Sequence, residues 1–288
     1  MISVIICTFN RCDSLASTLE SFMRIETGAD FTWELIVVDN NSVDATKKVV
    51  SEFNTRLPIR YFFEPKQGLA HARNRGITQT QGDIIVFTDD DVIVTNDWLY
   101  QIGRALKTFS DVDLLFGRTL MNSAEQYALS TKESEEQEIF EHPSYPWGVG
   151  NGNNMVIRRS LFSRIGLFDT NLGAGTKISS AEDTDFVHRA LKSGCKILYS
   201  PQCLVYHNHD RVTPLEINKI IYNYAKGRGA FYLKFMMCFD PWVSRLFYKE
   251  LKRLFRQLIN RPTDYKNIFM NIKGLGYGMI LWLKLRPR

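Results

Sequence analysis

The sequence has no CxxC pair, although five cysteines are scattered along its 288 residues. Cysteines in this arrangement exclude the usual structural zinc site and are typical of proteins kept in a reducing compartment. The N-terminus also lacks the basic and apolar segments of a secretory signal, because residues 2–6 already have the composition of a strand. Both absences favour a cytoplasmic protein.

Three further absences narrow the class of protein. No GxGxxG follows a predicted strand, which excludes the dinucleotide-binding fingerprint. Residues 268–285 are apolar in parts, but two lysines, an asparagine and three glycines interrupt them, so no membrane-spanning helix is expected there. No recognised nucleic-acid-binding motif is present, and nucleic acid is therefore not an expected partner.

What the first hundred residues do contain is an alternation of strand and helix patterns. Strand patterns cover residues 2–7, 34–38, 59–63 and 84–87, and helical spacing covers residues 13–25, 42–53 and 69–80. Short joints between such units predict an α/β fold with a mostly parallel sheet flanked by helices. Residues 113–120 predict a further strand, and the polar, acidic residues 123–142 predict an exposed helix or a mobile loop.

Three consecutive aspartates, Asp89, Asp90 and Asp91, end the apolar run that follows Gly82. The C-terminal ends of strands are where open α/β sheets bind their ligands. Adjacent carboxylates repel one another unless a cation lies among them, and Mg²⁺ or Mn²⁺ held together with a diphosphate would meet that need. The alternative is a solvated acidic turn that caps the next helix.

Polar residues also follow the first two predicted strands. They are Thr8, Asn10, Arg11, Asp39 and Asn41. A carboxylate such as Asp39 could accept the imide N–H of uracil, and Thr8 and Asn10 could line the base. A single aspartate at a strand end is otherwise typical of a helix cap.

Arg73 lies one turn into the helix that begins near Gly68. There it could reach a phosphate group, although a surface arginine on an amphipathic helix fits the spacing equally well. Glu182 and Asp183 lie at the start of a later predicted helix, where the helix dipole alone would favour them. His207 and His209 alternate in an extended segment and so point the same way.

Residues 147–154 combine three glycines with asparagines just before an apolar stretch. Glycine lets a backbone approach a ligand closely, and side-chain amides suit sugar hydroxyls. A plain turn before a strand is the alternative.

In this order, the segments 4–11, 37–42, 68–76 and 88–91 resemble the motifs of the family 2 glycosyltransferases. The resemblance covers roughly residues 1–210. It implies a GT-A fold and an inverting transfer of a sugar from a nucleotide-diphosphate sugar, with a UDP-sugar favoured. The acceptor would be a glycan or a lipid-linked saccharide in polysaccharide or glycoconjugate biosynthesis.

The resemblance also implies roles for individual residues. Asp39 would bind the nucleobase, and Asp89 and Asp91 would be the outer carboxylates of the DxD motif, although a triple aspartate allows two registers. The implied metal ligands of Mn²⁺ or Mg²⁺ are Asp91, Asp89 and His207, with His209 the weaker candidate. The implied nucleotide-binding residues are Thr8, Asn10, Arg11, Asp39, Asn41, Arg73, Asp89 and Asp90.

On the acceptor side, the resemblance makes Asp183 the general base that deprotonates the acceptor hydroxyl. Glu182 would help to position the acceptor, or would be the base if the register differs. The residues implied to contact the donor sugar or acceptor are Trp147, Gly152, Asn153, Asn154 and Glu182. Two alternatives remain, a nucleotidyltransferase and a non-catalytic nucleotide-sugar-binding protein, and the intact acidic residues argue against the second.

The C-terminal part differs in charge from the rest of the chain. Residues 215–288 contain 15 Lys or Arg and 4 Asp or Glu, whereas the remaining 21 basic and 27 acidic residues give the rest a negative net charge. We expect a catalytic domain over residues 1–213, with a nucleotide-binding half (1–110) and an acceptor half (111–213).

Residues 214–288 would form a basic, amphipathic helical extension. Such an extension could hold the protein peripherally on the anionic inner face of a membrane. The alternatives are that these helices pack on the catalytic domain or form a dimer contact.

Overall fold

The computed structural model describes residues 1–26, 31–123, 130–141, 145–209, 213–260 and 265–286. In these residues nine strands form one sheet in the order β3-β2-β1-β4-β8-β6-β9-β5, with β7 paired to β9. The strands are β1 (Ile2–Thr8), β2 (Trp33–Asp39), β3 (Ile59–Phe63), β4 (Ile84–Asp89), β5 (Val92–Val94), β6 (Leu114–Met121), β7 (Glu138–Phe140), β8 (Asn154–Arg158) and β9 (Ile197–His207).

The N-terminal half of the sheet is parallel, as the alternating pattern predicts. β1 pairs in parallel with β2 and β4, and β2 pairs in parallel with β3. The register places Thr8 opposite Asp39 and Cys7 opposite Asp89, so the polar strand ends meet at one edge. The other half is mixed, because β8 enters antiparallel between β4 and β6. The α/β class is therefore confirmed, with a sheet less uniformly parallel than expected.

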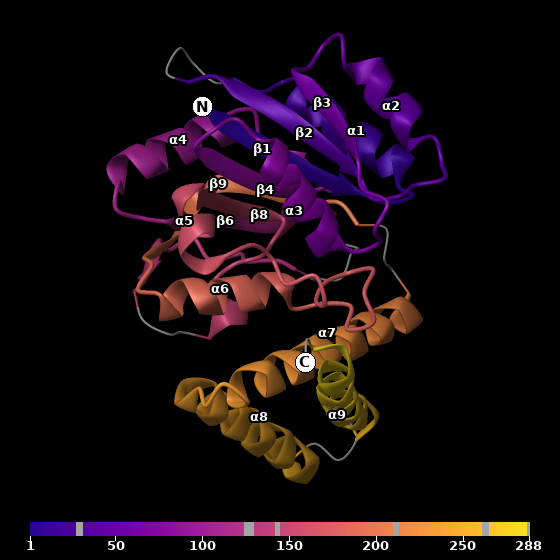
Figure 1. The fold of residues 1–288 in the computed structure, drawn as a ribbon, viewed down its shortest axis with the longest axis vertical. Helices are drawn as coiled ribbons and strands as arrows, with labels where there is room; N and C mark the ends of the chain where they lie inside the picture. The colour runs from indigo at the N-terminus through magenta and orange to yellow at the C-terminus, as the bar shows by residue number, and fades with distance from the viewer. Residues whose placement is uncertain (27–30, 124–129, 142–144, 210–212, 261–264, 287–288) are drawn as a thin grey trace.

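Helices cover both faces of the sheet (Figure 1). One hydrophobic core includes α1 (Cys12–Phe22), α2 (Thr46–Phe53) and α4 (Trp98–Thr108). The other core includes α3 (Leu69–Gln79), α5 (Ser160–Ile165) and α6 (Glu182–Lys192). The strands between them are apolar on both sides because both faces are buried.

Two elements differ from their predicted extents. α2 begins at Thr46 rather than near residue 42, because Asp44 Oδ1 accepts hydrogen bonds from the Thr46 amide (3.1 Å) and hydroxyl (2.6 Å). Within the predicted exposed segment 123–142, residues 138–140 instead form β7 against β9. Residues 124–129 and 142 of that segment lie outside the described residues.

The C-terminal extension folds into three helices, α7 (Pro214–Met236), α8 (Pro241–Asn260) and α9 (Tyr265–Leu285). A short 3-10 helix, η1 (Pro146–Gly148), precedes β8. The helices α7, α8 and α9 gather on the side of α6 away from the sheet (Figure 1). Lys234 of α7 lies 2.6 Å from both Asp169 and Asp185. Among the described residues, no helix has the length and apolar content needed to cross a bilayer.

Candidate active site

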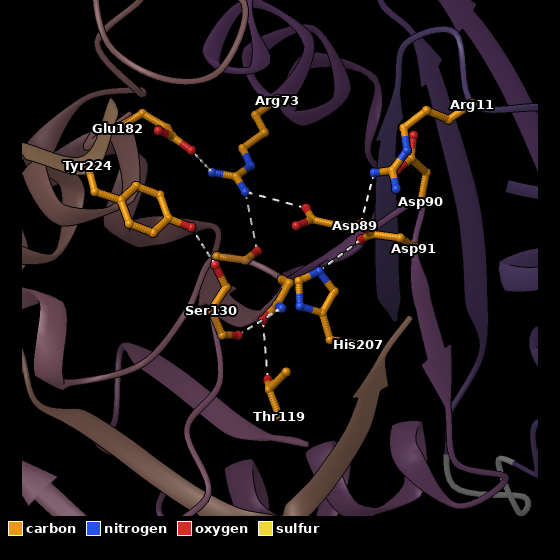
Figure 2. Close-up of polar contacts among 12 residues, drawn as sticks. Arg11, Arg73, Asp89, Asp90, Asp91, Thr119, Ser130, Glu182, His207 and Tyr224 are labelled. Carbon is orange, nitrogen blue, oxygen red and sulfur yellow. Dashed lines mark hydrogen bonds and ion pairs between the residues drawn. The ribbon is translucent and has the colours of Figure 1, made fainter. Parts of the chain in front are cut away.

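A cavity of about 890 Å³ opens at the C-terminal edge of the parallel strands. Its walls come from the ends of β1 and β4, from the loop around residues 146–153, from the start of α6 and from α7. Figure 2 shows its charged groups from several elements turned toward one another. This is the position at which an open α/β sheet binds its ligand.

The acidic cluster (Asp89, Asp90 and Asp91) lies at one end of the cavity. Asp89 ends β4, and the other two form the tight turn into β5. Arg11 Nη1, just beyond β1, lies 3.0 Å from Asp90 Oδ1 and 2.8 Å from Asp91 Oδ2 (Figure 2). Arg11 is therefore the counter-ion that keeps these carboxylates together.

His207 lies beside the cluster because β5 pairs with β9. This pairing sets Val92 opposite His207 and brings His207 Nε2 to 3.3 Å from Asp91 Oδ1. His209 is buried next to it, with ring centroids 5.0 Å apart. The predicted pair of histidines thus lies at the acidic cluster, with His207 in contact with Asp91.

The carboxylates of the cluster differ in their electrostatics. Burial opposes ionisation of Asp91, but His207 and Arg11 outweigh it and hold the pKa of that carboxyl below its usual value. Burial raises the pKa of Asp90 to about 7, and Arg11 counteracts that rise only in part. Asp91 is therefore the more strongly anionic of the two.

The donor set suits a divalent cation without forming a finished metal site. Carboxylate oxygens with one imidazole are acceptable ligands for Mn²⁺, and less so for Mg²⁺. Across the described ranges, no three His, Cys, Asp or Glu side chains are already arranged around one point. At Asp91, Arg11 contacts Oδ2 while Oδ1 faces His207, so a metal there would share this carboxylate with Arg11.

Arg73 of α3 lies between the acidic cluster and Glu182, which marks the other end of the cavity (Figure 2). Its guanidinium is buried, with Nη1 3.0 Å from Glu182 Oε1 and Nη2 3.8 Å from Asp89 Oδ1. The same Nη2 donates to the carbonyl of Gly152 at 3.3 Å. A Cβ at position 152 would lie 2.7 Å from that nitrogen, which explains the glycine.

Glu182 and Asp183 form the first turn of α6 and both line the cavity. Burial, reinforced by the neighbouring Asp183, raises the pKa of Glu182 to about 7 even though Arg73 opposes this shift. Asp183 Oδ1 accepts a hydrogen bond from the Thr184 amide at 2.7 Å. The two carboxylates thus differ, since Glu182 is tied to Arg73 and Asp183 accepts a hydrogen bond from the adjacent Thr184 at the cavity wall.

Only some of the predicted base-binding residues line the cavity, and the others lie in the structure next to it. Thr8 and Arg11 line the cavity, whereas Asn10, Asp39 and Asn41 are absent from its lining. Asp39 is buried and accepts hydrogen bonds from the Ser42 amide and from the Tyr61 hydroxyl, each at 2.8 Å.

Asn10 and Asn41 lie in the loops that follow β1 and β2. Asn10 Oδ1 accepts from the Val43 amide at 2.8 Å and so joins the two loops. Asn41 is exposed, with a positive φ of 69°. Both residues shape the strand ends beside the cavity.

The glycine- and asparagine-rich segment also divides. Trp147, Gly152 and Asn153 line the cavity. Asn153 Oδ1 accepts from the Thr119 hydroxyl at 3.2 Å. Asn154 lies outside the lining, where its amide nitrogen donates to the carbonyls of residues 118 and 203 and its oxygen accepts from Trp98. Asn154 therefore ties strands together.

The sequence reasoning missed the part of the cavity wall that α7 supplies. The lining residues on this helix are Glu216, Lys219, Ile220, Asn223, Tyr224 and Arg228. Tyr224 also lies 2.8 Å from Ser130 through their hydroxyl groups (Figure 2). Their helical spacing could have revealed them, because it places these side chains on one face of α7 that differs from the basic face of α8.

Comparison with known proteins identifies the family. Residues 3–166 match the family described as Glycosyl transferase family 2. The chain belongs to glycosyltransferase family 2. The family assignment made from the motifs is thereby confirmed.

Curated relatives of this family 2 protein are moderately similar. It is 28% identical over 216 residues to the glycosyltransferase AglE of Haloferax volcanii, a match that covers 72% of this chain and 66% of AglE. It is 28% identical over 214 residues to the succinoglycan biosynthesis protein ExoM of Rhizobium meliloti, covering 71% of this chain and 66% of ExoM. The chain thus spans slightly under two thirds of their length.

Solved structures share the fold. The mannosyltransferase PcManGT of Pyrobaculum calidifontis, in complex with GDP-Man and Mn²⁺, matches with a TM-score of 0.64 and 19% identity, covering 96% of this chain and 74% of its own. S. aureus TarS 1-349, in complex with UDP-GlcNAc, matches with a TM-score of 0.60 and 20% identity, and the match covers 79% of this chain and 66% of the TarS chain. These likenesses confirm the GT-A fold.

Proposed function

We propose that this family 2 protein transfers a sugar from a nucleoside-diphosphate sugar, with a UDP-sugar favoured, to a hydroxyl of a glycan or lipid-linked saccharide. One observation carries the proposal: a single cavity has the acidic cluster at one end and Asp183 at the other. The first suits a diphosphate with its cation, and the second suits the removal of a proton from a hydroxyl.

Asp91, Asp89 and His207 are the residues that would hold Mn²⁺ or Mg²⁺. Such a cation would neutralise charge on the diphosphate as it leaves, a contribution worth several kcal/mol by order of magnitude. Arg73 would keep positive charge at the same end of the cavity while anchoring Glu182 at 3.0 Å.

Asp183 would act as the general base toward the acceptor hydroxyl. The hydroxyl oxygen would attack the anomeric carbon as its proton passes to the carboxylate and the bond to the diphosphate breaks. One displacement of this kind inverts the anomeric carbon and needs no carboxylate nucleophile. Glu182 is the less suitable base, because its oxygen is already held by Arg73.

The donor is the part of this proposal that experiment must decide first. UDP-GlcNAc and GDP-Man are the nucleotide sugars bound in two similar structures, and they differ in both base and sugar. We would titrate the purified protein with UDP-glucose, UDP-GlcNAc and GDP-mannose by calorimetry, with and without Mn²⁺. Binding of one of them that strengthens with Mn²⁺ is expected.

Two results would count against the proposal. One is the absence of binding to all members of a wider nucleotide-sugar panel. The other is release of pyrophosphate from a nucleoside triphosphate, which would identify a nucleotidyltransferase instead.

We further propose that the extension rests on an anionic membrane through α8. Its inward face, which includes Val243, Leu246 and Leu254, is buried in the extension. Five other apolar residues of α8 are exposed, namely Tyr248, Leu251, Phe255, Leu258 and Ile259. Lys249, Lys252 and Arg256 lie among them, and Glu250, the single acidic residue of α8, is buried against Arg253.

The membrane proposal can be tested with the full-length chain. Vesicles of phosphatidylcholine with phosphatidylserine should sediment the protein at low salt, and attraction of about 1 kcal/mol per basic residue should weaken as salt rises. Replacing Lys249, Lys252 and Arg256 by Gln should release it. Equal sedimentation of this variant and the wild type would remove α8 as the anchor.

A further inference from the structure

The turn just before the catalytic pair has an unusual backbone. Ser179 and Ala181 have φ values of 71° and 79°, and they lie three positions and one position before Glu182. Residues with a Cβ rarely adopt the left-handed region, and they stay there only where the surrounding structure fixes them. The position at which α6 begins therefore depends on whatever holds the 179–181 turn.

α7 holds this turn by two hydrogen bonds. Ser180 Oγ donates to the carbonyl of Asn223 at 2.8 Å, and Lys226 Nζ donates to Ser179 Oγ at 2.9 Å. Lys226 is only 8% exposed, so its side chain has been withdrawn from solvent to make this contact. A buried lysine is unusual enough to require a partner.

Gly227 allows the helix to come this close. A Cβ at position 227 would collide with Ser180 Oγ and would lie 3.0 Å from Ala181 Cβ. The backbone of α7 at Gly227 therefore lies directly against the Ser180 and Ala181 side chains of the turn.

We propose that α7 is a positioning element of the active site and that Gly227 sets its distance from the 179–181 turn. The turn fixes the start of α6, and the start of α6 fixes where the Asp183 carboxylate faces the cavity. This inference rests on the proposed function, because the position of Asp183 matters to the rate only if that carboxylate takes the proton.

The test compares Gly227→Ala with Gly276→Ala in the full-length protein. Both add one methyl group to a long helix, but a Cβ at 276 on α9 meets nothing within 4 Å. Gly227→Ala should increase amide exchange over residues 179–184 at least tenfold, while exchange in β1 and β4 stays unchanged. Gly276→Ala should leave both regions as in the wild type.

Turnover supplies the second readout. With whichever of UDP-glucose, UDP-GlcNAc and GDP-mannose binds, and with water as acceptor, nucleoside-diphosphate release should fall at least tenfold in Gly227→Ala. The KM for that donor should stay within twofold, because the donor end is not touched. Ser180→Ala combined with Gly227→Ala should recover part of both losses, since it removes the colliding oxygen.

The outcomes separate this inference from the proposed function. Unchanged exchange over 179–184 in Gly227→Ala would overturn it, as would a rise in KM with kcat unchanged. Failure of every donor to bind would instead count against the proposed function. Amide exchange over residues 179–184 needs no donor, so it would still test whether Gly227 sets the position of the turn. If Gly227→Ala does not fold, Lys226→Met offers the same comparison without added bulk, with a smaller increase in exchange expected.

Discussion

The two ends of the cavity contain the same kinds of groups, acidic side chains around one arginine, but differ in how firmly that arginine is held. At the acidic cluster, the Arg11 side chain is 30% exposed and comes from the loop after β1. At the Glu182 end, the Arg73 side chain is 3% exposed and comes from the interior of α3, and it also reaches to 3.8 Å from Asp89. Both arginines lie about 3 Å from their nearest carboxylate oxygens.

The difference shows which end can change on binding. A partly exposed arginine can leave its carboxylates for water or for a phosphate, provided that a cation takes its place beside them. A buried arginine cannot, because it would leave an uncompensated charge in a region of low dielectric. We infer an adaptable donor end and a rigid end next to the proposed general base. Five predictions can break or sharpen this contrast.

The largest expected effect is on the rigid end, in Asp183→Asn. If this carboxylate is the base, turnover should fall by about 10²–10⁴-fold. Mn²⁺-dependent affinity for the donor should stay near that of the wild type, because the acidic cluster is intact. Steady-state kinetics with a matched titration would check both. A variant that turns over at the wild-type rate would shift the role to Glu182.

The next effect is on stability, in Arg73→Met. Removing one partner of a buried ion pair should cost about 3–5 kcal/mol in the free energy of unfolding. Urea denaturation would measure it. The double variant Arg73→Met with Glu182→Gln is the control, and it should recover a large part of the loss. If both variants lose the same free energy of unfolding, the charge that Arg73 compensates is not that of Glu182.

The same variant carries a pH dependence. Burial and Asp183 raise the pKa of Glu182 to about 7 from 4.5, so the folded state holds this proton more tightly than the unfolded chain. Glu182 therefore costs stability as the pH rises from about 4.5 through 7. Without Arg73 that cost should grow, so Arg73→Met should be more destabilising at pH 8 than at pH 5.

A smaller effect is expected at the adaptable end, in Asp91→Ala. If Asp91 is a metal ligand, its loss should weaken Mn²⁺-dependent donor binding by at least roughly 10–100-fold, the typical cost of losing a residue that only supports a ligand. The fold should remain intact, because Arg11 is partly exposed and keeps its contact with Asp90 when Asp91 is removed. Calorimetry of the folded variant with Mn²⁺ would test this, and an unchanged affinity would exclude Asp91 as a ligand.

The sequence predicts the strands, the helices and their polar ends better than the long-range contacts that their side chains make. The strand ends and the acidic cluster follow from local patterns, because apolar runs and polar breaks are properties of neighbouring residues. The hydrogen bond from Tyr61 to Asp39 depends on the pairing of β2 with β3, and the pair of Arg73 with Glu182 joins residues 109 positions apart. Contacts of that kind are set by the tertiary fold.

The C-terminal extension shows the same limit. Its amphipathic pattern is visible in the sequence, but the pattern does not say whether a helix faces a membrane, a second chain or its own domain. In the structure α7 lies against the catalytic domain and lines the cavity, while α8 keeps an exposed basic and apolar side. One predicted extension therefore has two different surroundings.

The smallest effect, and the sharpest test of the contrast, is in Arg11→Met. Arg11 Nη1 contacts both Asp90 and Asp91, so a divalent cation held by Asp91 would share that carboxylate with the guanidinium, and the two positive charges would repel each other. Removing Arg11 should tighten binding of Mn²⁺ alone by roughly tenfold, equal to about 1.4 kcal/mol. Electron paramagnetic resonance of free Mn²⁺ would measure it without any nucleotide.

Arg75→Met is the matched control, because Arg75 is exposed on α3 and lies over the Phe62 ring, 5.7 Å from its centroid. It removes the same charge without touching the acidic cluster. If both variants bind Mn²⁺ equally, the effect is one of net charge and does not depend on the contacts of Arg11. If only Arg11→Met gains affinity, and the gain shrinks once UDP is added, then the released guanidinium contributes to holding the diphosphate. That result would mean that Arg11, because it is partly exposed, can leave the acidic cluster when a metal ion binds there. The buried Arg73, in contrast, stays beside Glu182.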